Sequence, residues 1–360
     1  MSPPRAWGSR GPLARALWPL SQVYRALAAL DRARYRWGWA PIHRPPVPVV
    51  VIGNWIVGGA GKTPTLLLVL ELLAQWGWRA GVVSRGYGRQ SAGVQLAHAT
   101  STAHDLGDEP LLIHRRSGVP LAVAERRAEA AKALLTAHPE VQVIVSDDGL
   151  QHHGLARDLS VLVFDARGLG NGWLLPAGPL RQDRDAPPLP GSAGTQLRLY
   201  TDGVASTPWP GHLAQRQLSA AWPLAAWWAG RASDRRPLAA LAQASQLATA
   251  GAGHWWAAAG LAQPERFFAM LSAAGIHATH LPLPDHAPFD PLPWPATATD
   301  VLVTEKDAIK LRPEALPPGQ RVWVLPLDLQ APPEFEQALG KALAALLGPP
   351  PGSPHGPPPR

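Results

Sequence analysis

Cysteine is absent from this sequence of 360 residues. Its absence excludes disulfide bonds, cysteine-ligated zinc sites and thiol nucleophiles, and it fits a reducing compartment. Long apolar runs are also missing, since none approaches the roughly 18 to 20 residues that a membrane-spanning helix needs. We do not expect a secretory signal, because arginines interrupt the apolar part of the N-terminal segment and no convincing cleavage site follows it.

The chain is rich in apolar residues and in positive charge. Its hydrophobic content is 46%, and 360 residues are enough for two ordinary domains with sizeable cores. The formal net charge is +7 and the isoelectric point is about 10.2. This charge predicts an anionic partner, such as a phospholipid surface, a nucleic acid or a phosphorylated substrate.

A glycine-rich turn inside residues 47–76 is the feature around which the chain is organised. An apolar run (VPVVVIG) precedes the turn (GGAGKTP), and an apolar helix-like segment (TLLLVLELLAQW) follows it. Gly58, Gly59 and Gly61 can adopt backbone angles that point several N–H groups into one small space, and the start of the helix adds its dipole. The turn is therefore predicted to hold a polyphosphate, although a merely tight connection would also use these residues.

The residues after the last glycine supply the side chains of such a site. Lys62 would reach the β- and γ-phosphates of a nucleotide, and the Thr63 hydroxyl would ligate Mg²⁺. The strict P-loop motif has glycine five positions before Gly61, whereas this chain has Ile56. The predicted nucleotide-binding run consists of Ile56, Val57, Gly58, Gly59, Ala60, Gly61, Lys62 and Thr63.

A pair of aspartates supplies the second half of a nucleotide site. The run VQVIVSDDGLQHH indicates an apolar strand that ends in Asp147 and Asp148. A carboxylate at the end of a buried strand can hold Mg²⁺ or its water. Two aspartates in this position can also form an ordinary turn, but the preceding P-loop favours the metal role. Gln151 and His152 follow at once, and histidine is a poor ligand for Mg²⁺.

Three further segments carry charged side chains in expected loops. Asp108 and Glu109 precede a proline, and they either cap a helix or act as a base toward a hydroxyl and as a carboxylate near Mg²⁺. Arg85, in the turn SRGYGR, either holds an anion or is solvated. Asp285 and His286 form either an oriented general base or a polar turn. The residues alone leave these alternatives open.

The alternation of apolar strands with helical segments predicts an α/β fold. Its core would be a P-loop NTPase-like parallel sheet with helices on both faces and ligand at the carboxyl ends of the strands. A loop rich in proline and glycine then leads to a second, smaller α/β domain. We expect an N-terminal helix at 1–40, the P-loop core at 41–205, the second domain at 206–345 and a disordered tail at 346–360.

Residues 5–36 are expected to form a basic amphipathic helix. Such a helix suits the interface of an anionic membrane, but a helix packed on its own domain explains the pattern equally well. Pro19 should kink or interrupt it. The apolar positions at helical spacing are Leu13, Leu17, Leu20, Tyr24, Leu27 and Leu30.

Seven motifs, taken together and in this order, resemble one known family. They are VIGNWIVGGAGKTP, SRGYGR, GDEP, DDGLQH, LLPAGPLR, PDHAPF and VTEKDAIKL, and the resemblance runs from about Leu13 to Leu325. The chain resembles the tetraacyldisaccharide 4′-kinases of lipid A biosynthesis in Gram-negative bacteria. That resemblance implies transfer of the ATP γ-phosphate to the 4′-hydroxyl of a tetraacylated glucosamine disaccharide 1-phosphate, which gives lipid IVA.

The resemblance also implies cofactors, location and residue roles. ATP and Mg²⁺ would be bound, and the N-terminal helix would attach the enzyme to the anionic cytoplasmic face of the inner membrane. Asp108 would act on the attacking hydroxyl, paired with His286. The family pattern has an acidic residue where this chain has Gln182. Phosphates and metal would be bound by Lys62, Thr63, Asp147, Asp148, Glu109, Gln151 and His152, and substrate by Arg85, Tyr87 and Arg126.

Two other classes of protein are alternatives. A GTPase-like switch usually has an Asn/Thr-Lys-x-Asp loop, but the lysine of TEKD at 304–307 is one place out of register. That class also leaves the GDEP and PDH motifs unexplained. A nucleic-acid-binding ATPase would use the positive charge, yet no nucleic-acid-binding motif is present and the basic residues are scattered. We therefore predict no nucleic-acid partner.

Overall fold

The computed structural model describes residues 5–192, 194–249, 254–285 and 287–349. These residues divide into two compact units. The smaller unit is Arg216–Asp328, and the larger unit comprises the described residues on either side of that range. Most of the predicted C-terminal tail lies outside the described residues.

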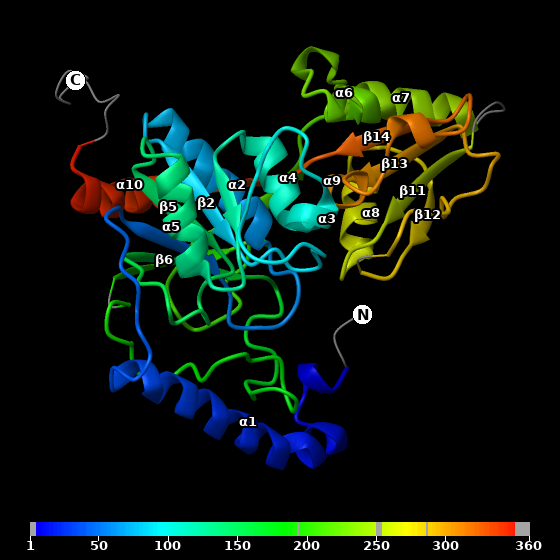
Figure 1. Cartoon of the computed structure of the whole chain (residues 1–360). Helices are drawn as coiled ribbons and strands as arrows, with labels where there is room; N and C mark the ends of the chain where they lie inside the picture. The colour runs from blue at the N-terminus through cyan, green and yellow to red at the C-terminus, as the bar shows by residue number, and fades with distance from the viewer. Residues whose placement is uncertain (1–4, 193, 250–253, 286, 350–360) are drawn as a thin grey trace. The chain divides into compact units, whose positions relative to one another are not determined.

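A sheet of eight strands forms the centre of the larger unit (Figure 1). The strand order is β3-β4-β2-β5-β1-β6-β7-β8, and the neighbouring strands are parallel except for β3 with β4. The five central strands are buried throughout, as expected of apolar strands covered on both faces. The strands are β1 (Val49–Gly53), β2 (Ala80–Ser84), β3 (Gln95–Leu96), β4 (Leu121–Val123), β5 (Val143–Asp147), β6 (Leu159–Phe164), β7 (Thr195–Tyr200) and β8 (His212–Leu213).

Helices cover both faces of this sheet. The chain moves in one direction along the sheet from β1 through α2 to β2 and through α4 to β4, and it returns through α5 to β5. Because such crossovers are right-handed, α2 and α4 share one face and α5 lies on the other. The predicted α/β class with a parallel core is confirmed. The helices of this unit are η1 (Arg5–Gly8), α1 (Pro12–Arg36), α2 (Lys62–Gln75), α3 (Ala103–Leu106), α4 (Asp108–Ser117), α5 (Arg127–Ala137) and α10 (Pro333–Leu347).

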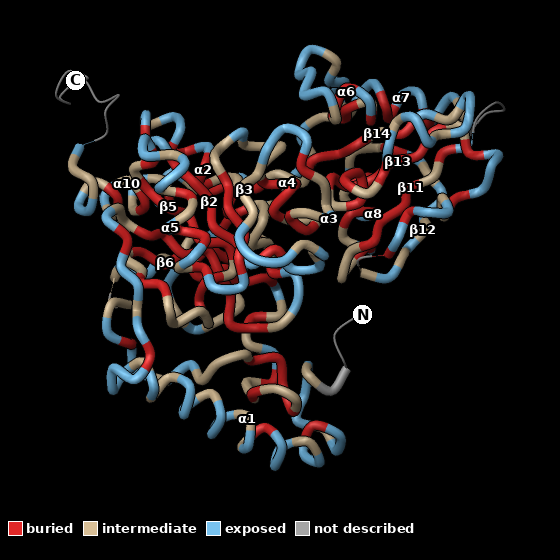
Figure 2. The backbone as a smooth tube through the Cα atoms, in the orientation of Figure 1, coloured by how far each residue is buried: buried red, intermediate tan, exposed pale blue. Residues whose placement is uncertain are grey.

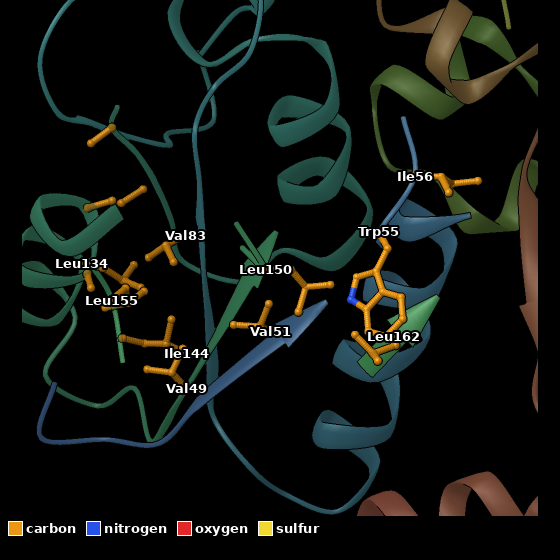
Figure 3. Packing of buried hydrophobic residues seen from close by; sticks show 14 of the residues in the cluster. Val49, Val51, Trp55, Ile56, Val83, Leu134, Ile144, Leu150, Leu155 and Leu162 are labelled. Carbon is orange, nitrogen blue, oxygen red and sulfur yellow. The ribbon is translucent and has the colours of Figure 1, made fainter. Parts of the chain in front are cut away.

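The apolar core extends to the carboxyl end of β1, where it positions the aspartate pair. Figure 3 shows Val51 of β1 beside Leu150, a residue of the turn that follows β5. A Cβ atom at Gly53 would lie 2.6 Å from Cγ of Leu150, so only glycine lets that turn pack so closely on β1. The turn after β5 is therefore held against the segment that leads into the glycine-rich loop.

Helix α1 has a largely exposed surface (Figure 2). It runs without interruption through Pro19, where we expected a kink or a break. Leu17 and Tyr24 are partly buried, whereas Leu20 and Leu27 are exposed. Among the described residues, no helix combines the length and the apolar character that crossing a membrane requires.

The smaller unit contains a second sheet, with strand order β10-β14-β13-β11-β12. Its neighbouring strands are parallel except for β10 with β14. The elements are β10 (Trp222–Pro223), α6 (Leu224–Trp228), η2 (Ala232–Asp234), α7 (Leu238–Thr249), β11 (Trp255–Ala259), α8 (Pro264–Ala273), β12 (Thr279–Pro282), β13 (Asp300–Thr304), α9 (Glu305–Ala308), η3 (Pro313–Ala315) and β14 (Arg321–Leu325).

Several elements were not predicted from the sequence. They include α7 and β14 in the smaller unit, and a separate two-stranded sheet of β9 (Gln215–Leu218) and β15 (Leu327–Gln330). Helix α10 groups with the larger unit and contacts β7. It ends at Leu347, so its last two residues fall inside the range predicted as tail.

Candidate active site

The glycine-rich loop connects β1 to α2 and adopts backbone angles that side chains disfavour. Gly58 has φ of 98° and Gly61 has φ of 93°, both in the left-handed region. A Cβ atom at Gly58 would also lie 3.1 Å from Nη1 of Arg167. Gly59 has neither a left-handed φ nor a close neighbour, so the conformation of the loop requires Gly58 and Gly61 but not Gly59.

Side chains from several strand ends fix the backbone of this loop. The carbonyl of Val57 accepts a hydrogen bond from Nη1 of Arg167 at 3.2 Å, and the carbonyl of Ala60 accepts one from the buried Thr201 hydroxyl at 3.0 Å. Thr65, in the first turn of α2, binds the carbonyl of Gly61 at 2.8 Å. With its carbonyls bound on the protein side, the loop is held in one conformation at the start of α2, as an anion site requires.

Lys62 links the loop to the aspartates. It is the first residue of α2, and its Nζ lies 3.7 Å from Oδ2 of Asp148 and 3.5 Å from Oδ1 of Asn54. Thr63 is the next residue of the helix and is partly buried. Because β1 and β5 are adjacent and parallel, with Ile52 opposite Asp147, their carboxyl ends bring both halves of the predicted site together.

Asp147 is a buried carboxylate among other negative charges. It is the last residue of β5, is 5% exposed, and accepts a hydrogen bond from Ser84 at 2.9 Å. Burial, and then the charges of Glu109 and Asp148, raise the pKa of Asp147 to about 6. A desolvated carboxylate beside two others is the environment in which a bound cation is most stabilising.

Asp148 has the opposite electrostatic character. It has φ of 46°, the one left-handed non-glycine residue among those the structure describes. Burial raises its pKa, but the hydrogen bonds from Arg181 and the nearby positive charges outweigh burial and lower the pKa of Asp148 to about 2. Asp148 is therefore ionised at neutral pH, while the pKa of Asp147 lies much closer to neutral pH.

The oxygen ligands of the aspartate pair and of Glu109 suit Mg²⁺. Asp147, Asp148 and Glu109 offer hard oxygen ligands, and the raised pKa of Asp147 reflects its burial and then the nearby charges of Glu109 and Asp148. In the part of the chain that the structure describes, no three acidic or histidine side chains are close enough to hold a metal ion by themselves. Mg²⁺ usually takes one or two carboxylates directly and fills the rest of its shell with water and phosphate oxygens, so part of this set would reach the ion through water.

Arg181 is a site residue that the sequence analysis missed. Its guanidinium binds both carboxylate oxygens of Asp148, at 2.7 and 2.8 Å, and donates to the carbonyl of Asn54 at 2.8 Å. The motif LLPAGPLR contains this arginine, but only its neighbour Gln182 was considered. Gln182 accepts a hydrogen bond from Nε2 of Gln151 at 2.8 Å, and Gln151 also donates to Asn54 at 3.2 Å.

His152 and the two arginines at the start of α5 have distinct environments. Nε2 of His152 accepts a hydrogen bond from the backbone N–H of Arg127 at 3.2 Å. Burial and then the charges of Arg127 and Arg85 lower the pKa of His152 to about 4, so it is neutral at pH 7. Arg127 is buried and donates to the carbonyls of Asp147 and Asp148, whereas the Arg126 side chain is 81% exposed and pairs with Glu129 at 3.6 Å.

Asp108 and Glu109 occupy the first turn of α4, immediately after Gly107. Gly107 has φ of 87°, and a Cβ atom there would lie 2.5 Å from the carbonyl oxygen of Tyr87. The SRGYGR turn therefore packs directly against the start of α4. This contact places the backbone of Tyr87, a residue that is 77% exposed, beside the glycine that precedes Asp108.

His286 lies outside the described residues, but its neighbours are fixed within the smaller unit. Asp285 pairs with Nζ of Lys306 at 3.1 Å, and the carbonyl of Ala287 accepts a hydrogen bond from Nζ of Lys310 at 3.0 Å. Both lysines belong to the VTEKDAIKL motif, for which the sequence suggested no role. In this structure the motif binds the chain on both sides of position 286.

Comparison with known proteins adds an independent line of evidence. The family described as tetraacyldisaccharide-1-P 4′-kinase matches residues 13–344. The tetraacyldisaccharide 4′-kinase of Methylibium petroleiphilum is 53% identical over 94% of this chain and 92% of the relative, and that of Leptothrix cholodnii is 47% identical over 95% of each. The crystal structure of LpxK from Aquifex aeolicus in complex with ATP has a TM-score of 0.72 and 26% identity, covering 93% of this chain and 99% of that one.

The buried and exposed arginines at the start of α5 allow a matched comparison. Arg127→Met should lower the melting temperature by about 4 to 8 °C, because losing the bonds that support the aspartate turn costs about 2 kcal/mol. Arg126→Met, on the exposed neighbour, should leave the melting temperature unchanged. Differential scanning fluorimetry of the two variants measures this, and equal melting temperatures would show that Arg127 does not support the turn.

Proposed function

This chain belongs to the tetraacyldisaccharide-1-phosphate 4′-kinase family, and we propose how its residues carry out the family's reaction. It is an ATP-dependent kinase that phosphorylates the 4′ position of a lipid A precursor. The observation that carries the residue assignments is the 3.7 Å ion pair between Lys62 and Asp148, which joins the glycine-rich loop to the aspartate turn.

The glycine-rich loop at 56–63 binds the phosphates of ATP. Its backbone at the start of α2 supplies N–H groups, and Lys62 supplies a positive charge to the β- and γ-phosphates. Mg²⁺, held by Thr63, Asp147, Asp148 and Glu109, would neutralise charge that develops on the transferring phosphoryl group. Arg181 pairs with Asp148 at the same site, where it offsets the negative charge of that carboxylate and supplies a further positive group.

Asp108 is the residue proposed to accept the proton of the 4′-hydroxyl. It lies in the same helix turn as Glu109, whose charge acts on Asp147, and this supports a role for Asp108 beside the phosphates. Phosphoryl transfer needs mainly positioning and charge stabilisation, with a base that accepts the proton late. Arg85 and Tyr87, on the turn packed against α4, and Arg126 would contact the anionic substrate. His286 is proposed as a second catalytic residue.

Helix α1 is proposed to rest on the cytoplasmic surface of the inner membrane. A substrate with four acyl chains stays in the bilayer, so an enzyme that acts on its headgroup must work at that surface. The apolar residues of α1 and its C-terminal flank that face solvent suit the interior of the interface, and its arginines suit anionic headgroups. These exposed apolar residues are Leu13, Trp18, Leu20, Val23, Leu27, Leu30, Trp37 and Trp39.

The kinase reaction is tested with ATP labelled on its γ-phosphate and detergent-dispersed tetraacyldisaccharide 1-phosphate. Wild-type protein should transfer label to the lipid, and Lys62→Ala should reduce transfer by at least about a hundredfold, because a phosphate-binding charge is lost. Thin-layer chromatography of the lipid measures both. Absence of labelled lipid from folded, ATP-binding wild type would reject the proposed function.

Asp108 is tested by separating turnover from nucleotide binding. Asp108→Ala and the isosteric Asp108→Asn should each lower kcat by about a hundredfold to ten-thousandfold, because a general base of this kind contributes that much. The affinity for a fluorescent ATP analogue should stay within about twofold. A parallel loss of nucleotide affinity and turnover would instead place Asp108 in the metal site.

The membrane contact is tested with vesicles that contain anionic phospholipid. Leu20→Glu combined with Leu27→Glu should weaken vesicle binding about tenfold or more, because two apolar side chains can no longer enter the interface. Leu247→Glu, on an exposed leucine of α7, is the matched control and should bind like wild type. Sedimentation with the vesicles measures binding, and unchanged binding of the double variant would contradict the proposal.

A further inference from the structure

Three side chains of helix α1 make polar contacts with one short segment of the larger unit, residues 181–187. The hydroxyl of Tyr24 donates a hydrogen bond to the carbonyl of Arg181 at 2.7 Å. Arg25 pairs with Asp183 at 3.3 Å, and Arg32 donates to the carbonyl of Pro187. The segment that receives α1 therefore begins at the arginine that binds Asp148.

Arg181 is held from three directions. Its backbone N–H donates to the carbonyl of Trp55 at 2.7 Å, just before the glycine-rich loop. Its guanidinium binds Asp148. Its carbonyl is bound by Tyr24, so α1 supplies the third of these contacts.

The peptide group that Tyr24 binds joins two residues of the site. It links Arg181, whose side chain binds Asp148, to Gln182, whose side chain binds Gln151. Fixing the orientation of this one peptide group therefore constrains two contacts to the aspartate turn at once.

Tyr24 is suited to a lasting contact of this kind. Its ring is partly buried and packs against the apolar core of the larger unit. Burial raises the pKa of its phenol above the ordinary value of 10.0, so the hydroxyl stays protonated and able to donate.

We propose that Tyr24 is a positioning residue that holds Arg181 on Asp148, so that the seating of α1 sets the geometry of the nucleotide site. The kinetic part of this inference, a change in kcat, rests on the proposed function. A single neutral hydrogen bond changes an equilibrium by a factor of about 3 to 10, which sets the size of the expected effect.

Removal of the Tyr24 hydroxyl has a matched control on the same helix. Tyr24→Phe should lower kcat about threefold to tenfold and weaken binding of a fluorescent ATP analogue with Mg²⁺ by a similar factor. The KM for lipid and the binding to anionic vesicles should not change. Tyr35→Phe removes a hydroxyl that makes no hydrogen bond among the described residues, while its ring packs on His153, and it should match wild type in all four measurements.

A double-mutant cycle shows whether Tyr24 acts through Arg181. In an Arg181→Met background, or Arg181→Lys if that variant does not fold, Tyr24→Phe should weaken nucleotide affinity by a smaller factor than in wild type, because only the Gln182 contact then remains to be lost. An unchanged Tyr24→Phe variant overturns the proposal. So does an effect of the same size without Arg181, or one confined to vesicle binding and lipid KM. Nucleotide affinity needs no turnover, so the cycle remains decisive even if wild type fails to phosphorylate the lipid.

Discussion

Repulsion between the buried carboxylate of Asp147 and the partly buried carboxylates of Asp148 and Glu109 is the constraint on which the site of this kinase depends. Negative charges so close together and partly removed from water are stabilised only if cations lie beside them. Lys62, Arg127 and Arg181 supply those cations from three segments that are far apart in the sequence. The site can therefore form only when the parallel sheet has brought these segments together.

Some of this arrangement could be predicted from the sequence because the signals are local. Left-handed glycines, a lysine at a helix start and aspartates at a strand end each leave a short pattern, and the adjacency of parallel strands then places Lys62 near Asp148. Arg127 and Arg181 could not be found in this way. Each lies among other basic residues, and its function is defined by carbonyls and carboxylates 20 to 33 positions away. Arg127 differs from Arg126 in being buried, and no short sequence pattern shows which of two neighbouring arginines will be buried.

The elements of the fold, like the residues of the site, were mostly predicted where the sequence signal is local and missed where it is not. Strands β1 and β5 are apolar runs rich in valine and isoleucine, so the runs VPVVVIG and VQVIVSDD predicted their ranges within a few residues. Helix α7 is rich in alanine and leucine and has less contrast between its faces than α8, whereas α10 has a regular apolar face, formed by Phe335, Leu339 and Leu343, that the sequence analysis overlooked. Pro19 was expected to kink or interrupt α1, but the helix continues through it, although an interior proline removes one backbone hydrogen bond.

The pairing of Arg181 with Asp148 has a consequence for how the protein is made. A site that depended on a divalent ion for its counter-charge would leave the newly synthesised chain unfinished until the ion arrived, and chelation would then unfold it. Here the chain carries its own counter-ion, so the aspartate turn can fold without metal. Folding of the turn is thereby separated from binding of the nucleotide, and Asp148 keeps its place and its charge while the site is empty.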